Sequence, residues 1–243
     1  MLQEFIKKAM KGTILTKANV IICIPSGVTA VERRAVRESC KKAGAQNVLI
    51  VEEPMAAAIG AGLPTTSPTG CMIVDIGGGT SEVAVVSLGG IVASRSIRCA
   101  GDAFDASIIN FIKKKYNLLI GERTAENIKI EIGSAFPSEN EETMEIKGRN
   151  LLNGLPENIT ISSAEIRDAL VEPLAKVIDA IKVTLESTPP ELSADIIDQG
   201  ITLAGGGALL RGLDKLINRE TGMPVYIAEY PLDCVAEGTG KIL

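Results

Sequence analysis

The chain has 243 residues, of which 46% are hydrophobic, and a formal net charge of −5. A chain of this length can bury a sizeable core, and its acidic balance argues against nucleic acid as a partner. The absence of histidine excludes histidine-based catalytic triads and metal sites. Five cysteines without a C-x-x-C pair indicate a reducing cytoplasm, and no apolar run approaches the ~20 residues that span a bilayer. We therefore expect a protein that is neither secreted nor membrane-spanning.

The chain opens with alternating strand and helix signals. A β-branched run over 20–24 predicts a strand that ends in a proline-serine-glycine turn. Thr29 and Glu32 then have the spacing of a capping box, which predicts the start of a helix, and Gly44 ends it. This order is typical of an α/β fold.

Two carboxylates stand at the end of the next strand. The apolar run 48–51 is followed by Glu52 and Glu53, and Pro54 suits the first turn of another helix. The carboxyl ends of strands are where α/β sheets bind ligands. The segment 63–70, rich in proline, threonine and serine, predicts a linker and a domain boundary.

A run of three glycines, Gly77 to Gly79, separates an apolar strand from the alternating run 81–86. The alternation predicts a return strand, so the glycines form a hairpin rather than the strand-to-helix turn of dinucleotide folds. Their N–H groups can approach phosphate oxygens, Asp75 could hold a magnesium ion through water, and Thr80 adds a hydroxyl. A glycine-rich turn with Asp75 as an ordinary turn residue is the open alternative.

The middle of the chain indicates a small α+β insertion followed by a long helix. Pro173 lies within the long helix and should kink it. The expected elements are helices over 102–116 and 124–134, strands over TMEIKG and ENITIS, and the long helix after Ser162.

A second run of three glycines, Gly205 to Gly207, follows the strand 201–204 and leads into a helix. A flat backbone there could pass under a base or ribose, with the helix amino end nearby to favour phosphate. A tight strand-to-helix connection is the plain alternative. The chain then closes with the strand PVYIA and a short tail whose EGTGK sequence is not a P-loop.

These motifs together resemble a known superfamily. IVDIGGGTSEVAVV resembles the second phosphate loop of the actin, hexokinase and heat-shock chaperone superfamily, and ITLAGGGALLRGLDKLI resembles its adenosine motif. VIICIPSGVTAVERRAV and EEPMAAAIGAG resemble its first connecting segment. Within the superfamily, IGERTAENIKIEIGSAFP, NLLNGLPENITI and TPPELSADIIDQGITLAGGGALLRGLD resemble the MreB/Mbl family of bacterial actins, over essentially the whole chain.

The resemblance implies an α/β, actin-like ATPase fold with ribonuclease-H-like halves. The implied parts are a partial subdomain IA at 1–67 and 235–243, subdomain IIA at 68–104 and 170–234, and subdomain IIB at 105–169. The family's first phosphate hairpin and the small subdomain after it have no counterpart here, because no D-x-G-T sequence precedes Asp75. A site with one of two phosphate clamps is expected to bind nucleotide weakly. The resemblance implies an ATP hydrolase, but with one clamp missing the activity of this chain is left open.

The resemblance also implies roles for individual residues. Glu53 would orient the attacking water with help from Thr80, although a helix-start acid is its alternative. Asp75 would hold Mg²⁺ through water. The spacing of Glu126 and Lys129 by itself favours a solvated ion pair, whereas the resemblance implies that they bracket ribose and base. The implied nucleotide-binding set is Asp75, Gly77, Gly78, Gly79, Thr80, Glu126, Lys129, Gly205, Gly206 and Gly207.

The implied function is that of a rod shape-determining, ATP-binding cytoskeletal protein whose filaments organise cell-wall synthesis. Its cofactors would be ATP or ADP with Mg²⁺. Its partners would be further copies of itself, the cytoplasmic face of the membrane and the cell-wall elongation machinery. The alternatives are a non-polymerising sugar or acetate kinase and a chaperone-type ATPase of the same superfamily.

A candidate membrane contact lies near the amino end. Ile14 and Leu15 are flanked by lysines, which suits shallow insertion at an anionic surface. A solvated loop with an incidental apolar pair is the alternative.

Overall fold

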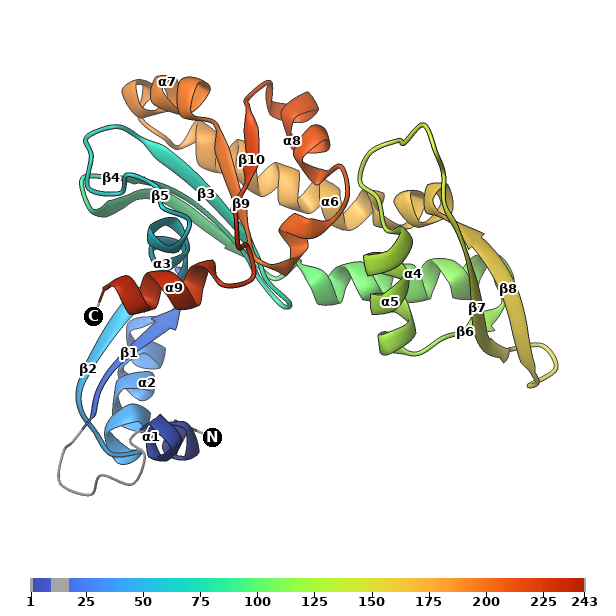
Figure 1. Ribbon diagram of the computed structural model, residues 1–243, viewed down its shortest axis with the longest axis horizontal. Helices are drawn as coiled ribbons and strands as arrows, with labels where there is room; N and C mark the ends of the chain where they lie inside the picture. The colour runs from blue at the N-terminus through green and yellow to red at the C-terminus, as the bar shows by residue number, and fades with distance from the viewer. Residues whose placement is uncertain (1, 10–17, 243) are drawn as a thin grey trace.

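A five-stranded mixed sheet forms the centre of the molecule in the computed structural model, which describes residues 2–9 and 18–242 (Figure 1). Its strand order is β10-β9-β3-β4-β5. β3 runs antiparallel to β4 and parallel to β9, so the predicted glycine hairpin is confirmed. The strands are β3 (Cys71–Ile76), β4 (Ser81–Ser87), β5 (Gly90–Ile97), β9 (Ile201–Ala204) and β10 (Val225–Ile227).

β3 is buried on both faces, which explains its nearly continuous apolar sequence. Met72 and Val74 join the main core on one face, whereas Cys71 and Ile73 join a second core on the other. Because strand side chains alternate, Asp75 projects to the same face as Cys71 and Ile73. This alternation places the carboxylate on the second-core side of the sheet.

Helices cover both faces of this sheet. α6, α7 and α8 pack on one face, and α3 packs on the other with α9 beside it (Figure 1). Among the described residues, no helix is both long and apolar enough to cross a membrane. The helices are α3 (Glu53–Gly60), α6 (Ser163–Glu186), α7 (Pro190–Gln199), α8 (Leu213–Thr221) and α9 (Cys234–Lys241).

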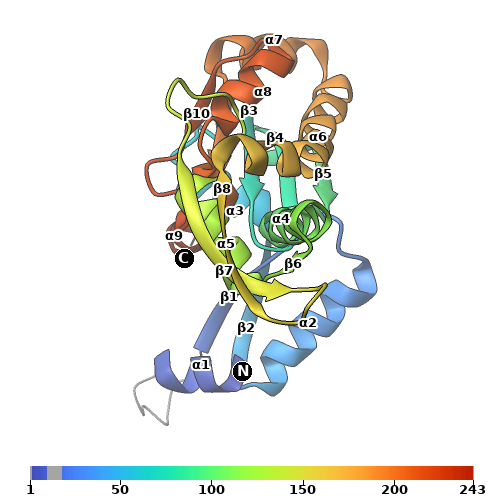
Figure 2. The same ribbon diagram turned by 90° about the vertical axis from the view of Figure 1, so that its right-hand side faces the viewer.

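A two-stranded parallel sheet lies at one end of the molecule, next to the amino terminus (Figure 2). The predicted capping box is confirmed, because the Thr29 side chain accepts from the Glu32 N–H and the Glu32 side chain accepts from the Thr29 N–H. The elements here are α1 (Leu2–Ala9), β1 (Ala18–Ile24), α2 (Ala30–Lys42) and β2 (Ala45–Glu52).

The opposite end carries a three-stranded antiparallel sheet with two helices (Figure 1). The two helices and two of the strands were predicted, whereas the short strand 118–119 was not. Ile112, Leu118, Ile146 and Ile161 from this part belong to the same core as the central sheet. The elements are α4 (Gly101–Tyr116), β6 (Leu118–Leu119), α5 (Glu122–Ile132), β7 (Thr143–Asn150) and β8 (Pro156–Ser162).

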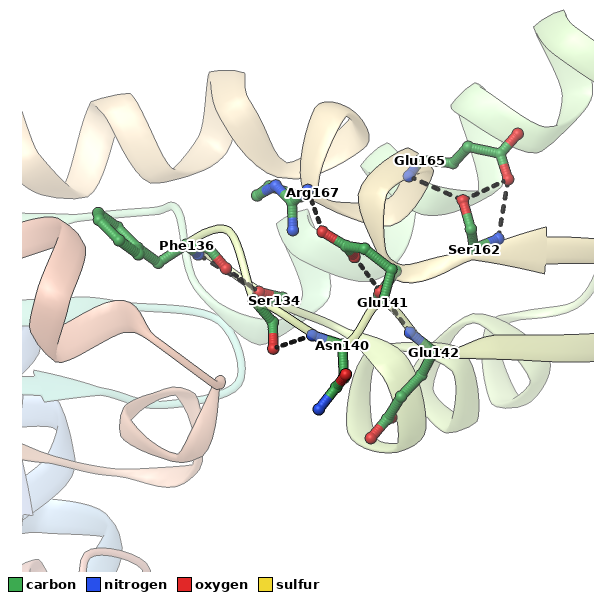
Figure 3. Close-up of polar contacts among 10 residues, drawn as sticks. Ser134, Phe136, Asn140, Glu141, Glu142, Ser162, Glu165 and Arg167 are labelled. Carbon is green, nitrogen blue, oxygen red and sulfur yellow. Dashed lines mark hydrogen bonds and ion pairs between the residues drawn. The ribbon is translucent and has the colours of Figure 1, made fainter.

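The loop between α5 and β7 is tied to the start of α6 (Figure 3). Arg167 donates to Glu141 at 2.7 Å, and the N–H of Glu142 donates to the Ser163 hydroxyl at 3.0 Å. Ser162 and Glu165 form a second capping box at the same helix start. These bonds fix the connection between the insertion and the long helix α6. The helix itself continues across Pro173.

Two predictions about local structure are wrong. The second glycine run leads into a short 3-10 helix, η1 (Gly206–Leu209), and α8 begins only at Leu213, so no α-helix starts at the glycines. The predicted tail is helical, because α9 packs against α3. The proposed membrane residues Ile14 and Leu15 lie outside the described residues.

Candidate functional site

A cavity of about 710 Å³ lies where the carboxyl end of β3 meets α3, α4, α5 and η1. Segments far apart in the sequence therefore form its walls. The residues that line it are Glu53, Asp75, Gly77, Gly78, Gly101, Asp102, Phe104, Asp105, Glu126, Lys129, Ile130, Gly205, Gly206, Gly207, Leu209, Leu210, Pro231, Leu232 and Val235.

The cavity brings together most of the residues that the sequence predicted. Gly79 and Thr80 are the exceptions, since neither lines it. Thr80 accepts from the Gly77 N–H at 3.0 Å through its carbonyl, and so closes the hairpin. Its predicted assistance to Glu53 therefore stays a prediction.

The glycine hairpin packs against the amino end of α4. The N–H of Gly101 donates to the Gly77 carbonyl at 3.1 Å, and the N–H of Asp102 donates to the Gly78 carbonyl at 2.8 Å. Within the described part of the chain, nothing accepts a hydrogen bond from the N–H of Gly78 or Gly79. Two unpaired donors beside a helix amino end suit an anion.

Packing within the chain does not explain why Gly78 is glycine. A Cβ added there would come no closer than 3.7 Å to Asp102, which is an ordinary contact. The surface of the hairpin is thus open, and a ligand that lies close to its backbone would require the glycine.

Three carboxylates gather around the end of β3. Asp75 lies directly opposite Glu82 in the β3-β4 register, and Glu53 starts α3 on the same side. Burial, followed by the charges of Glu53 and Glu82, raises the pKa of Asp75 to about 7. Burial and the Glu82 charge also raise the pKa of Glu53. Asp75 and Glu53 therefore have no positive charge among the described residues that favours their ionised forms.

A bound cation would supply the positive charge that is missing beside these carboxylates. Among the side chains that the structure describes, no lysine or arginine forms an ion pair with Glu53, Asp75 or Glu82. Those side chains also include no group of three acidic or cysteine residues that is arranged to hold a metal ion by itself. Mg²⁺ commonly uses one or two carboxylates together with phosphate oxygens, and Asp75 fits that arrangement.

The second glycine run is required by packing. Gly205 has φ +78°, and a Cβ there would lie 2.3 Å from the Ile76 carbonyl oxygen. A Cβ at Gly207 would lie 2.2 Å from the Ile76 side chain. Glycine therefore lets η1 approach the end of β3, which places its backbone on the cavity wall beside Asp75.

Glu126 and Lys129 both line the cavity, but the ion pair that their spacing favoured is not formed between them. The Lys129 ammonium lies 2.9 and 3.0 Å from the two carboxylate oxygens of Asp105 on α4. Glu126 is exposed. The partner of Lys129 is thus decided by the packing of α5 against α4.

Two groups of lining residues were not predicted from the sequence. Gly101, Asp102 and Asp105 come from the start of α4, where the sequence AGDAFD gave the only available signal, glycine and acidic residues just after a strand. Ile130, Leu209 and Leu232 are exposed apolar side chains at the cavity, and nothing in their local sequence distinguishes them.

The chain is similar to known proteins over its whole length. The sequence model described as MreB/Mbl protein matches residues 1–243. The chain is 55% identical over 244 residues to the cell shape-determining protein MreB of Escherichia coli strain K12. The matched region covers 100% of this chain and 70% of that protein. It is 51% identical to the cell shape-determining protein Mbl of Bacillus subtilis strain 168, which covers 100% of the chain and 73% of that protein.

Solved structures agree with these relatives. MreB5 of Spiroplasma citri bound to ADP superposes with a TM-score of 0.94 at 44% identity, over 99% of this chain and 73% of that chain. MamK in a double helical filament gives a TM-score of 0.84 at 21% identity, also over 99% and 73%, and shows the fold alone. The predicted α/β, actin-like fold is confirmed.

Proposed function

Since the chain belongs to the MreB/Mbl family of actin-like, cell shape-determining proteins, we propose that its 710 Å³ cavity binds an adenine nucleotide together with Mg²⁺. Two related solved structures contain ADP and AMPPNP, at 44% and 43% identity to this chain. The observation that supports the proposal most directly is the N–H group of Gly78, which donates to nothing among the described residues. It lies on the cavity wall with the buried carboxylate of Asp75, which has no lysine or arginine partner among those residues.

The phosphates bind at the hairpin. The free N–H groups of Gly78 and Gly79 donate to phosphate oxygens, and the amino end of α4 adds a favourable dipole. Asp75 is the residue that would hold Mg²⁺, which would supply positive charge beside the phosphates.

The nucleoside binds toward α5 and η1. The backbone of Gly205 to Gly207 lines one side of the cavity, and the exposed apolar residues Ile130 and Leu209 line it with them. Apolar walls of this kind suit a flat base.

Glu53 is the group placed to act on water. It lines the cavity from the start of α3, and its raised pKa makes its carboxylate a better proton acceptor than an exposed glutamate. We assign it the role of orienting the water that attacks the terminal phosphate, so that the protein hydrolyses ATP.

The proposal extends to assembly. The chain associates with further copies of itself into filaments that organise cell-wall synthesis with the elongation machinery, at the cytoplasmic face of the membrane. The filament of the structural relative MamK supports self-association of this fold. Ile14 and Leu15 remain the proposed membrane contact.

Calorimetric titration of the chain with Mg-ATP tests the site. We expect saturable binding by the unmodified chain and its loss in Asp75→Ala, because the substitution removes the carboxylate that holds the metal ion. Asp198→Asn, an exposed acid on α7, is the control and should bind like the unmodified chain. Equal affinity of Asp75→Ala and the control would refute the assignment of Asp75, and no binding by the folded, unmodified chain would refute the nucleotide proposal.

A further inference from the structure

Asp105 lies on α4 at the cavity and is hardly accessible to solvent. Its side chain is 15% exposed, and its Oδ1 atom is buried without a hydrogen bond of good geometry. Burial raises the pKa of Asp105, and Lys129 opposes that effect. An ionised carboxylate with so little access to water lowers the stability of the folded chain unless a cation stays beside it.

Lys129 is that cation. Its side chain is 18% exposed, and its ammonium lies within 3.0 Å of both oxygens of Asp105. The ammonium also donates to the Gly101 carbonyl at 3.4 Å. Lys129 is the only cation among the described residues that line the cavity, so its position decides where positive charge is available to a ligand.

The Gly101 contact connects the two ends of the cavity. The carbonyl of Gly101 accepts from Lys129, and its N–H donates to the Gly77 carbonyl in the glycine hairpin. One residue at the start of α4 therefore contacts both the α5 side of the cavity and the proposed phosphate loop.

We propose that Asp105 is a positioning residue for the nucleotide: it holds the Lys129 ammonium against α4, so that Lys129 presents its methylene stem, not its charge, to the nucleoside. This inference rests on the proposed nucleotide site and deepens it. With Asp105 in place, α5 stays at a fixed distance from the glycine hairpin, which sets the length of the cavity between base and phosphates.

A direct ionic contact between Lys129 and the ligand gives a different expectation. If the ammonium bound the nucleotide, Asp105 would compete for it, and removal of the Asp105 charge would leave affinity unchanged or raise it. If Asp105 positions Lys129, the same removal lowers affinity. The sign of the effect separates the two roles.

The test measures ADP affinity by calorimetry in the presence of Mg²⁺. We expect Asp105→Asn and Lys129→Met each to raise Kd about tenfold, and the double variant to show about the same tenfold loss, since both single changes break one interaction. Lys129→Arg keeps the pair and should stay within about threefold of the unmodified chain. Asp198→Asn is the control for loss of an acidic charge. Unchanged or tighter binding by Asp105→Asn, or a hundredfold loss in the double variant, would overturn the proposal.

A second measurement does not need a nucleotide. Amine acylation followed by mass spectrometry compares the reaction rate of Lys129 with that of Lys113, which is exposed on α4. We expect Lys129 to react several-fold more slowly in the unmodified chain and to approach the Lys113 rate in Asp105→Asn. Equal rates in the unmodified chain would overturn the positioning role, whereas a failure of ADP binding alone would count against the nucleotide site.

Discussion

At the scale of single residues, Glu52 and Glu53 show how neighbouring carboxylates reach different environments. Glu52 ends β2 and pairs with Arg33 at 3.0 Å, outside the cavity. Glu53 begins α3 and lines the cavity. The turn from strand to helix points the two side chains in different directions. Glu52 therefore forms an ion pair outside the cavity, whereas Glu53 is available to a ligand inside it.

We expect Glu53→Ala to retain Mg-ATP binding but to release phosphate about 100-fold more slowly, because a group that orients and deprotonates water contributes on this order. Single-turnover phosphate release measures the effect. Glu52→Ala is the adjacent control, and a normal rate in Glu53→Ala would remove that residue from the catalytic role.

Glu165 allows a prediction about stability and pH. Burial disfavours its ionised form, but hydrogen bonds from Lys115, Tyr116 and Ser162 outweigh it and lower the pKa of Glu165 to about 2. A lowered pKa in the folded state gives stability that is present above the unfolded value of 4.5 and is lost as pH falls toward 2.

Glu165→Gln should therefore lower the free energy of unfolding by about 2 kcal/mol at pH 7, and the difference from the unmodified chain should shrink at pH 3.5. Urea denaturation at the two pH values measures this. The exposed Glu186→Gln on the same helix should differ little from the unmodified chain at either pH. A pH-independent effect of Glu165→Gln would show that packing, and not charge, is what the substitution removes.

At the scale of elements, α3 and α9 pack at backbone contact. A Cβ at Gly60 would lie 1.7 Å from the Cys234 carbonyl oxygen, and a Cβ at Gly238 would lie 1.8 Å from the Ala56 carbonyl oxygen. Because α3 carries Glu53 at its first residue, this packing also helps to fix one wall of the cavity.

We expect Gly238→Ala to destabilise the chain by about 3 kcal/mol, since the added methyl group collides with a backbone atom that cannot move aside. Gly240→Ala in the same helix is the control, because a Cβ there has no neighbour within 4 Å. The higher helix propensity of alanine should make the control neutral or more stable by up to about 1 kcal/mol. Thermal unfolding of both variants measures the difference, and equal melting temperatures would contradict the close packing.

At the scale of the whole molecule, the cavity joins three parts of the chain. Glu53 follows the two-stranded sheet, Asp75 belongs to the central sheet, and Lys129 belongs to the insertion. A ligand that contacts all three favours one relative arrangement of them. An outer surface that is formed by more than one of these three parts then has one defined shape. Contact between copies of the chain through such a surface would therefore depend on the bound nucleotide, which is why we expect nucleotide-dependent assembly.

Sedimentation tests this expectation. Mg-ATP should increase the fraction of the chain that pellets at high speed, and Asp75→Ala should remove the increase while Asp198→Asn keeps it. Calorimetric binding without any change in sedimentation would count against filament formation by this chain and would leave nucleotide binding intact.

The sequence by itself determined the features that depend on neighbouring residues. The alternating run after Gly79 predicted the hairpin, and the spacing of Thr29 and Glu32 predicted a capped helix, because strand alternation and capping bonds involve only nearby positions. The ordered motifs also predicted the family and nine of the nineteen residues that line the cavity.

Only the tertiary structure decided the partner of Lys129, the helical nature of α9 and the position of α4 at the glycine hairpin. Lys129 and Asp105 are 24 positions apart, so their ion pair depends on how two helices pack. The glycines of α9 disfavour a helix locally, but they allow contact with α3 that stabilises one. Contacts between segments that are distant in the sequence decide these three features. The spacing of residues along the chain does not show which distant segments will meet.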